Sequence, residues 1–346
     1  MKIVRSETHR SHFPTGELYD GKLVRPFECP ERVDYINAAL AAAGLDDDID
    51  VKPVEESLLE QVHDAGYVEF LRTAWAQWSE LGHASDMIPT CLPVRRMNTH
   101  VPEHVDGKLG YYAFAAETAI TAGTWDAAFG AASLARTAQR SVSAGAPAAF
   151  ALCRPPGHHA AADYFGGYCF INNAAVAAQG FRNDGADRVA ILDVDFHHGN
   201  GTQDIFYERG DVFFASIHGD PAHEFPYFLG HADETGMGQG TGCNANYPLA
   251  PGTTFDRWLE ALDDALAKII AYNPDALVVS LGVDTFEADP ISSFKLTSDN
   301  FTTYGRRIGA LALPTVYVME GGYAVEEIGT NTVNVLTGHN ADSPLS

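Results

Sequence analysis

Short runs of apolar and β-branched residues recur along this 346-residue chain, with helical patterns between them. Most runs are continuous, and Gly, Pro or Asp bounds them, which is typical of strands buried on both faces of a parallel sheet. The expected strands are residues 2–5, 148–153, 189–194, 212–217, 276–281 and 315–319. The expected helices are residues 110–122, 124–144, 172–182, 254–272 and 299–313. This alternation predicts an α/β fold with a parallel sheet.

One stretch, residues 83–106, breaks this rhythm. It contains three Pro and scattered His and Arg, and it predicts a long loop between helical segments. Loops of that length inside a compact domain are usually functional or disordered. Arg95 and Arg96 stand out there in an acidic chain. They could pair with acids across a dimer interface or lie in solvent, and the sequence leaves both readings open.

The charge balance narrows the class of partner. The chain has 46 Asp and Glu against 22 Lys and Arg, a net charge of −24. This argues against a nucleic-acid backbone or an anionic membrane as partner. It fits a solvated, halotolerant surface, an acidic mouth that attracts a cationic substrate, or both. The five Cys form no CxxC pair, and the N-terminus has no apolar signal region, so we expect a cytoplasmic protein.

Several expected strands end in residues that can bind metals or move protons. In open α/β sheets, ligands bind beyond the carboxyl ends of the strands. The polar residues at those ends are His158, His159, Asp193, Asp195, His197, His198, Asp284 and Tyr323. One such residue alone is usually a cap or a surface group. Buried carboxylates without a counter-charge are costly, however, so the whole set indicates a functional site.

The spacing within this set indicates a metal site. Side chains alternate along a strand with a period of two, so Asp193, Asp195 and His197 share a face if the extended geometry continues. Asp284 would supply a third ligand from another strand. Two carboxylates and one imidazole leave an open position, as a hydrolytic zinc site requires. Oxygen-rich ligation also suits Fe(II) or Co(II).

Five longer motifs surround these residues: RPPGHHA, GGYCFINNAA, ILDVDFHHGNGTQDIFY, LGVDTFEADP and MEGGY. Together they resemble the histone deacetylase superfamily, and within it the bacterial acetylpolyamine amidohydrolases, over nearly the whole chain. The resemblance implies the three-layer αβα arginase–deacetylase fold, with a central, mostly parallel eight-stranded sheet. It also implies that residues 1–346 form a single zinc-dependent deacetylase domain. The expected substrates are N-acetylated polyamines: acetylputrescine, acetylcadaverine and acetylspermidine.

The resemblance also implies a role for each catalytic residue. The zinc ligands would be Asp195, His197 and Asp284. His159 matches the general base, which later acts as acid, and His158 matches its electrostatic neighbour. Tyr323 matches the hydrogen-bond donor to the developing oxyanion.

Further residues match supporting positions of the family. Asp193 is expected to pair with His158, and neutral Asn200 with His159, so that only the first pair favours an imidazolium. His198 has no match and is expected to be structural. The substrate channel would be lined by Gly167, Tyr168, Phe225 and Ile291, with Glu117 and Asp106 at its mouth. Potassium sites would involve Asp193, Asp195, His197, Ser216 and Ile217, and separately Phe206, Arg209, Val212 and Cys243.

The substrate class depends on the segment 83–106. It resembles the insertion with which polyamine deacetylases close a homodimer over the site, and such a lid would exclude protein tails. The main alternative is a deacetylase acting on acetyl-lysine in proteins or peptides. A non-catalytic acetyl-amine sensor and an arginase-like two-metal hydrolase are further alternatives. The complete set of catalytic residues argues against a sensor. The small number of metal ligands argues against a two-metal hydrolase.

Overall fold

Seven parallel strands form one central sheet, in the order β1-β4-β9-β8-β5-β6-β7. This computed structural model describes residues 1–95 and 98–341. The strands, in chain order, are β1 (Lys2–Val4), β4 (Ala148–Ala151), β5 (Val189–Asp193), β6 (Val212–Gly219), β7 (Asn244–Leu249), β8 (Ala276–Leu281) and β9 (Thr315–Met319). Six of them coincide with the expected apolar runs to within a few residues.

The expectation of eight strands is wrong, because the residues that the structure describes form a sheet of seven. Beside the outer edge of β1, only an isolated bridge forms between Ile3 and Asp48. That bridge lies within the acidic run 46–50, and charged residues of this kind are poor strand formers. The opposite edge is β7, which the sequence pattern missed. It carries Asn244, Asn246 and Pro248, residues that an edge strand tolerates.

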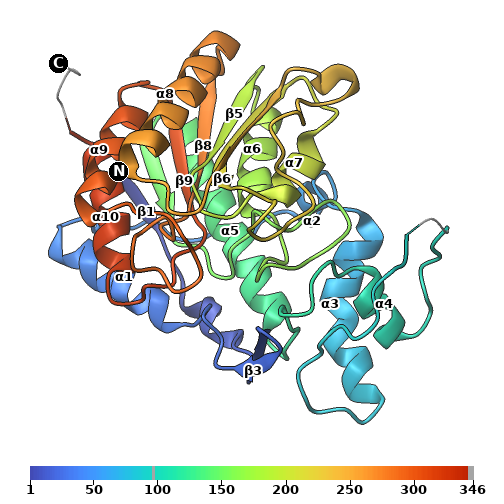
Figure 1. The fold of residues 1–346 in the computed structure, drawn as a ribbon. Helices are drawn as coiled ribbons and strands as arrows, with labels where there is room; N and C mark the ends of the chain where they lie inside the picture. The colour runs from blue at the N-terminus through green and yellow to red at the C-terminus, as the bar shows by residue number, and fades with distance from the viewer. Residues whose placement is uncertain (96–97, 342–346) are drawn as a thin grey trace.

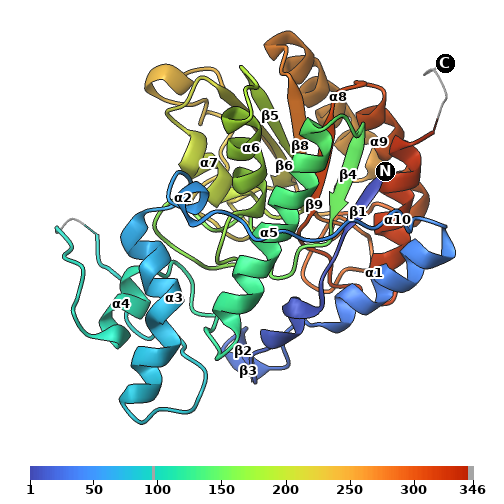
Figure 2. The same ribbon diagram turned by 180° about the vertical axis from the view of Figure 1, so that it is seen from behind.

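Helices cover both faces of the sheet (Figures 1 and 2). One face packs against α5 (Thr124–Ser143) and α6 (Asn173–Asn183), and the same apolar core continues outward to α2 (Glu56–Leu59), next to α6, and to α3 (Ala65–Glu80). The other packs against α1 (Glu31–Ala42), α8 (Phe255–Tyr272), α9 (Ser298–Gly309) and α10 (Ile328–His339). Alternate residues of β5 enter the two cores, since Ile191 joins the first and Leu192 the second. The three-layer αβα architecture is therefore confirmed.

The helix expected over residues 110–122 is wrong. The helix there, α4 (Val105–Tyr111), begins and ends earlier. The chain beyond it pairs with residues 165–166: Phe165 N–H donates to Tyr112 O at 2.7 Å, and Phe114 N–H donates to Phe165 O at 3.0 Å. Backbone pairing over a long sequence distance thus replaces helical bonds, and it brings Glu117 beside residues 167–168. The other four expected helices correspond to α5, α6, α8 and α9.

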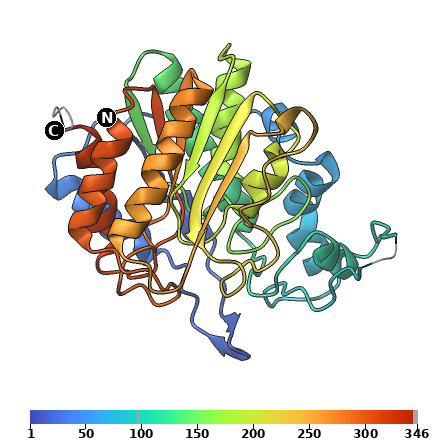
Figure 3. The same ribbon diagram turned by 45° about the horizontal axis from the view of Figure 1, so that its top comes forward.

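Shorter elements lie around this body, and two of them flank the carboxyl ends of the strands. Residues 83–95 and 98–104 belong to the expected connection between α3 and α4 and lie to one side of the sheet (Figures 1 and 3). In it the Arg95 guanidinium lies 5.5 Å from the centre of the Phe228 ring, while Arg96 lies outside the described residues. A hairpin of β2 (Glu17–Tyr19) and β3 (Lys22–Val24) projects nearby. The remaining elements are η1 (Glu7–Ser11), α7 (Asn200–Phe206) and η2 (Gly238–Gly240).

No helix in the described part of the chain is both long and apolar enough to cross a membrane.

Candidate active site

The ends of β5 and β8 bring Asp195, His197 and Asp284 together. One potential ligand atom from each lies within 4.8 Å of the other two. His197 Nδ1 is 3.1 Å from Asp284 Oδ2 and 3.4 Å from Asp195 Oδ1. All three side chains are buried. The arrangement therefore has the composition and closeness of a three-ligand metal site.

Backbone amides and glycines shape this cluster. Gly321 N–H donates to Asp195 Oδ2 at 2.8 Å, and Phe196 N–H donates to Asp284 Oδ1 at 2.8 Å. A Cβ atom on Gly321 would lie 2.5 Å from Asp195 Oδ2 and 2.6 Å from Asp284 Oδ2. Any side chain there would fill the space between the carboxylates, so the glycine keeps that space open.

The electrostatics of the cluster also fit a cation. Burial and the neighbouring Asp195 carboxylate raise the pKa of Asp284 to about 8. Burial disfavours protonation of His197, but the two carboxylates outweigh it and raise the pKa of His197 to about 10. No Lys or Arg of the described residues forms an ion pair with either carboxylate. A divalent metal would supply the missing positive charge, and two oxygens with one nitrogen suit zinc, iron or cobalt.

Two adjacent histidines lie beside the cluster with their ring centres 4.0 Å apart. His158 Nδ1 is 3.0 Å from Asp193 Oδ2, and His159 Nδ1 is 2.6 Å from Asn200 Oδ1. Burial lowers the pKa of His158, but Asp195 and Asp193 reverse this and raise it to about 10. Burial, together with His158 and His197, holds the pKa of His159 well below its usual value. The pair thus combines an imidazolium with a neutral imidazole.

Tyr323 lies in the loop that follows β9. Burial raises the pKa of its phenol well above the usual value, so the hydroxyl stays protonated as a hydrogen-bond donor. The buried Arg32 guanidinium lies 5.0 Å from the centre of the Tyr323 ring. Arg32 Nε also donates to Gly322 O at 2.7 Å. The Tyr168 ring packs edge-on against Tyr323, with centres 5.7 Å apart.

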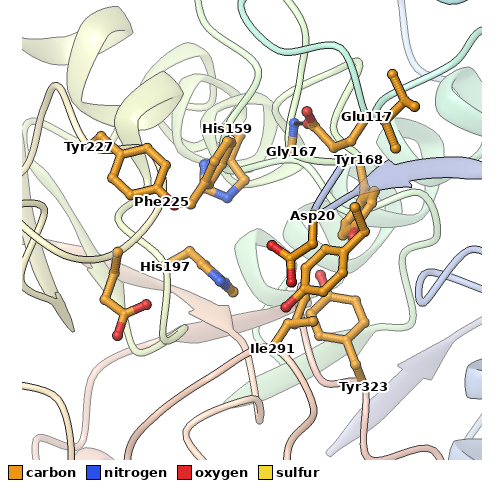
Figure 4. A pocket seen from close by; sticks show the side chains of 13 residues that line it. Asp20, Glu117, His159, Gly167, Tyr168, His197, Phe225, Tyr227, Ile291 and Tyr323 are labelled. Carbon is orange, nitrogen blue, oxygen red and sulfur yellow. Dashed lines mark hydrogen bonds between the residues drawn. The ribbon is translucent and has the colours of Figure 1, made fainter. Parts of the chain in front are cut away.

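A pocket of about 280 Å³ connects these residues to the surface. Its lining consists of Leu18, Tyr19, Asp20, Glu117, His159, Gly167, Tyr168, His197, Glu224, Phe225, Tyr227, Ile291 and Tyr323. In Figure 4, the side chains of His159, His197 and Tyr323 border one common space. Five of the six residues expected to bind substrate line it. The sixth, Asp106, lies exposed on α4 and is not among the lining residues of this chain.

The pocket wall is acidic, and its lining includes no Lys or Arg of the part of the chain that the structure describes. Glu117 Oε1 accepts hydrogen bonds from Gly167 N–H at 2.8 Å and from Thr118 Oγ1 at 2.9 Å. Asp20 and Glu224 join it, and the sequence pattern missed both. Asp20 occupies the turn of the β2–β3 hairpin, with φ 49°. An Asp-Gly pair is a recognisable hairpin signal, but nothing in the sequence places that hairpin at the pocket.

The residues expected to bind potassium fall into two groups. Asp193 and Ser216 are paired neighbours on β5 and β6, and Ile217 follows Ser216. In the second group, Phe206, Arg209 and Val212 connect α7 to β6, and Cys243 precedes β7. Phe206 O and Cys243 O each accept one backbone hydrogen bond, from Arg209 N–H and Phe214 N–H, both at 2.9 Å. Potassium binding by these residues stays a prediction.

His198 contacts other buried polar residues rather than the pocket. Its Nε2 lies 3.1 Å from Gln203 Oε1, and its ring centre lies 4.5 Å from that of His218. Burial and the nearby His218 hold the pKa of His198 well below its usual value. His198 therefore packs against Gln203 and His218 inside the protein.

Comparison with known proteins gives consistent similarities. The family model for the histone deacetylase domain matches residues 26–339. Acetylpolyamine amidohydrolase 1 of Pseudomonas aeruginosa is 56% identical over 341 residues, covering 98% of this chain and 99% of the relative. Acetylpolyamine amidohydrolase of Mycoplana ramosa is 56% identical over 340 residues, with the same coverage. The crystal structure of an acetylpolyamine aminohydrolase from Burkholderia pseudomallei superposes with a TM-score of 0.94 at 39% identity, covering 99% of each chain. The sequence and the fold of this chain, together with the buried residues at its strand ends, show that it belongs to the histone deacetylase family.

Proposed function

We propose that this protein hydrolyses the acetamide of N-acetylated polyamines and releases acetate and the free polyamine. One observation carries the proposal. His197 of the buried two-carboxylate, one-imidazole cluster lines a pocket whose wall is acidic and includes no Lys or Arg of the described residues. The first feature suits amide hydrolysis, and the second suits a cationic substrate. The names of relatives 56% identical to this chain point to the same substrates.

We expect Asp195, His197 and Asp284 to hold a zinc ion. When bound there, the metal would polarise the acetyl carbonyl and lower the pKa of a water molecule. The chain supplies the proton transfers. His159 is the expected general base, because its lowered pKa keeps it neutral and its Nδ1 is already occupied by Asn200, which leaves Nε2 for the proton. The same nitrogen would then return a proton to the leaving amine.

Two other residues stabilise the charge that develops on the acetyl oxygen. The Tyr323 phenol is a protonated donor, and a donor aimed at an oxyanion in a dry site typically contributes a factor of about 10² to 10³ in rate. His158 is held as an imidazolium by Asp193 and contributes positive charge beside the cluster. Its proton is therefore not the one that is transferred.

The acidic wall would recognise the distal ammonium groups of the substrate. The Glu117 carboxylate is fixed by Gly167 N–H, so it is oriented before a ligand binds. Charge-assisted hydrogen bonds from an ammonium to this carboxylate would favour acetylated amines over neutral acetamides. Asp20 and Glu224 extend the same negative surface. Asp106 would reach this mouth only from a second copy of the chain.

We further propose that the protein acts as a homodimer in the cytoplasm, with potassium as a structural ion. The insertion exposes Val94 and Val101, and the adjacent loop exposes Phe228. A second copy that covers these apolar side chains would also narrow access to the pocket. Such a lid would admit slender amines and exclude protein tails.

The test is a comparison of kcat/KM for the zinc-loaded protein between N-acetylputrescine, N-acetylcadaverine and an acetyl-lysine peptide. We expect the diamines to be preferred by tenfold or more, about 1.4 kcal/mol of transition-state free energy. If the peptide is preferred, the substrate assignment is wrong and the protein is a deacetylase of acetyl-lysine. If neither substrate is hydrolysed, the proposed activity itself is wrong.

A further inference from the structure

A buried carboxylate outside the metal cluster accepts hydrogen bonds from two segments that line the pocket. Asp289 lies in the loop between β8 and α9, with 7% of its surface exposed, and no Lys or Arg of the described residues pairs with it. All of its hydrogen bonds come from backbone amides. Its Oδ2 accepts from Tyr323 N–H at 2.7 Å and from Ala324 N–H at 3.2 Å, and its Oδ1 accepts from Ile291 N–H at 3.1 Å.

Two of these amides belong to pocket residues from different strand ends. Tyr323 follows β9, and Ile291 follows β8, and both line the pocket. A single side chain therefore connects the segment that carries the expected oxyanion donor to the segment that carries Ile291. Because Asp289 accepts with both oxygens, its role requires a carboxylate rather than an amide.

The peptide group between Gly322 and Tyr323 is held from both sides. Asp289 accepts its N–H, and Arg32 Nε donates to its carbonyl oxygen at 2.7 Å. This peptide follows two glycines, and Gly322 has φ +132°, a conformation that is accessible mainly to glycine. Two consecutive glycines have more backbone freedom than any other pair of residues, so without Asp289 and Arg32 this segment would be poorly fixed. Rotation of this peptide would move the Tyr323 side chain.

We propose that Asp289 is a positioning residue, which fixes the Gly322–Tyr323 peptide and thereby places the Tyr323 hydroxyl for catalysis. The inference rests on the proposed function, because it assumes that Tyr323 acts in turnover. Asp289 is not among the residues that line the pocket, and it is not one of the three expected metal ligands. Its effect on the rate is transmitted through Tyr323.

The first test is a double-mutant cycle of Asp289→Ala and Tyr323→Phe, with Asp289→Asn as a milder variant that keeps one acceptor oxygen. We expect Asp289→Ala to lower kcat about 10- to 100-fold in the wild-type background and less than threefold in the Tyr323→Phe background. Asp289→Asn should have a smaller effect in the same direction, and it replaces Ala in the cycle if that variant does not fold. Equal losses in both backgrounds would show a general structural role and overturn the proposal.

The second test does not depend on activity. Hydrogen–deuterium exchange should become faster in residues 320–327 and 289–293 of Asp289→Ala, and unchanged exchange there would overturn the proposal. The matched control is Asp275→Ala. Asp275 also accepts two backbone amides, from Asp187 at 2.7 Å and Arg188 at 2.9 Å, but at the opposite end of β8. Its loss should leave kcat within about twofold of wild type, since surface changes away from a site have small effects. If the wild-type protein does not hydrolyse acetamides, the proposed function fails, while the exchange result still decides whether Asp289 holds the Tyr323 segment.

Discussion

Replacing Asn200 by Asp puts a negative charge beside the expected general base, His159, and conserves the shape of the substituted side chain. Asn200 Oδ1 lies 2.6 Å from His159 Nδ1, so the new carboxylate would occupy the same hydrogen-bonding position. A negative charge there stabilises the imidazolium form of His159. Because a general base must be neutral to act, turnover would be lost at a higher pH than in the wild type.

The structure contains an internal reference for the size of this effect. His158 has a carboxylate partner, Asp193 at 3.0 Å, and despite burial its pKa is raised to about 10 by the charges of Asp195 and Asp193 together with this hydrogen bond. His159 has a neutral partner, and its pKa is lowered well below 6.5 by burial and by the charges of His158 and His197. An opposite charge in contact typically shifts a pKa by about 1 to 3 units. We therefore expect the acidic limb of the kcat/KM profile to move up by at least about 1 unit, a roughly tenfold loss of rate on that limb.

The assay is kcat/KM for N-acetylputrescine from about pH 5 to 9 in the wild type and in Asn200→Asp. Asn37→Asp is the matched control, because Asn37 also accepts a hydrogen bond, from Arg5 at 3.1 Å, but lies on α1 and does not line the pocket. That variant should reproduce the wild-type profile. An acidic limb that does not move in Asn200→Asp would refute His159 as the base whose neutral form limits the rate.

Three further changes test separate parts of the account. Tyr323→Phe should lower kcat about 10²- to 10³-fold with little change in KM, because the lost hydrogen bond forms in the transition state; an unchanged kcat would exclude Tyr323 as the oxyanion donor. Glu117→Gln should raise KM for N-acetylputrescine about tenfold and leave an uncharged N-alkylacetamide unaffected, and equal effects on both substrates would contradict ammonium recognition. His63 is buried, lies 2.7 Å from Ala161 O and accepts from Asn172 N–H at 3.0 Å, and burial lowers its pKa from 6.5 to about 4. As the pH falls, His63 takes up a proton in the unfolded chain before it does so in the folded protein, so the free energy of unfolding should drop by roughly 3 kcal/mol between pH 6.5 and 4. Thermal unfolding of His63→Gln across this window should show a weaker pH dependence. A pH dependence identical to that of the wild type would contradict the lowered pKa of His63.

The fold was predictable where burial on both faces leaves a simple pattern. The runs that became β5, β8 and β9 are continuous and apolar, because helices cover both sides of the sheet at these strands. The pattern failed at β7, since an edge strand tolerates Asn and Pro. It also failed at residues 110–122, where pairing with residues 165–166 overrides the local helical pattern. Both errors arise because tertiary contacts, rather than local propensity, decide the structure there.

The centre of the site could be located from the sequence because strand ends converge at one edge of the sheet. Asp195, Asp284 and Tyr323 each follow the end of a buried strand, β5, β8 and β9, by a few residues, so strand order alone brings them near one another. Asp20 and Glu224 could not be found in this way, because a hairpin and a loop place them. The role of Asp289 was also hidden, since its partners are backbone amides, which leave no mark in the sequence.

We expect the cluster of Asp195, His197 and Asp284 to hold a metal that is required for deacetylation. The most direct measurement is the metal content of the protein together with N-acetylputrescine turnover, before chelation, after chelation and after addition of Zn²⁺. We expect about one divalent ion per chain, loss of turnover on chelation, recovery with zinc, and neither metal nor turnover in Asp284→Asn. Full turnover by the metal-free wild type, or by Asp284→Asn, would contradict it.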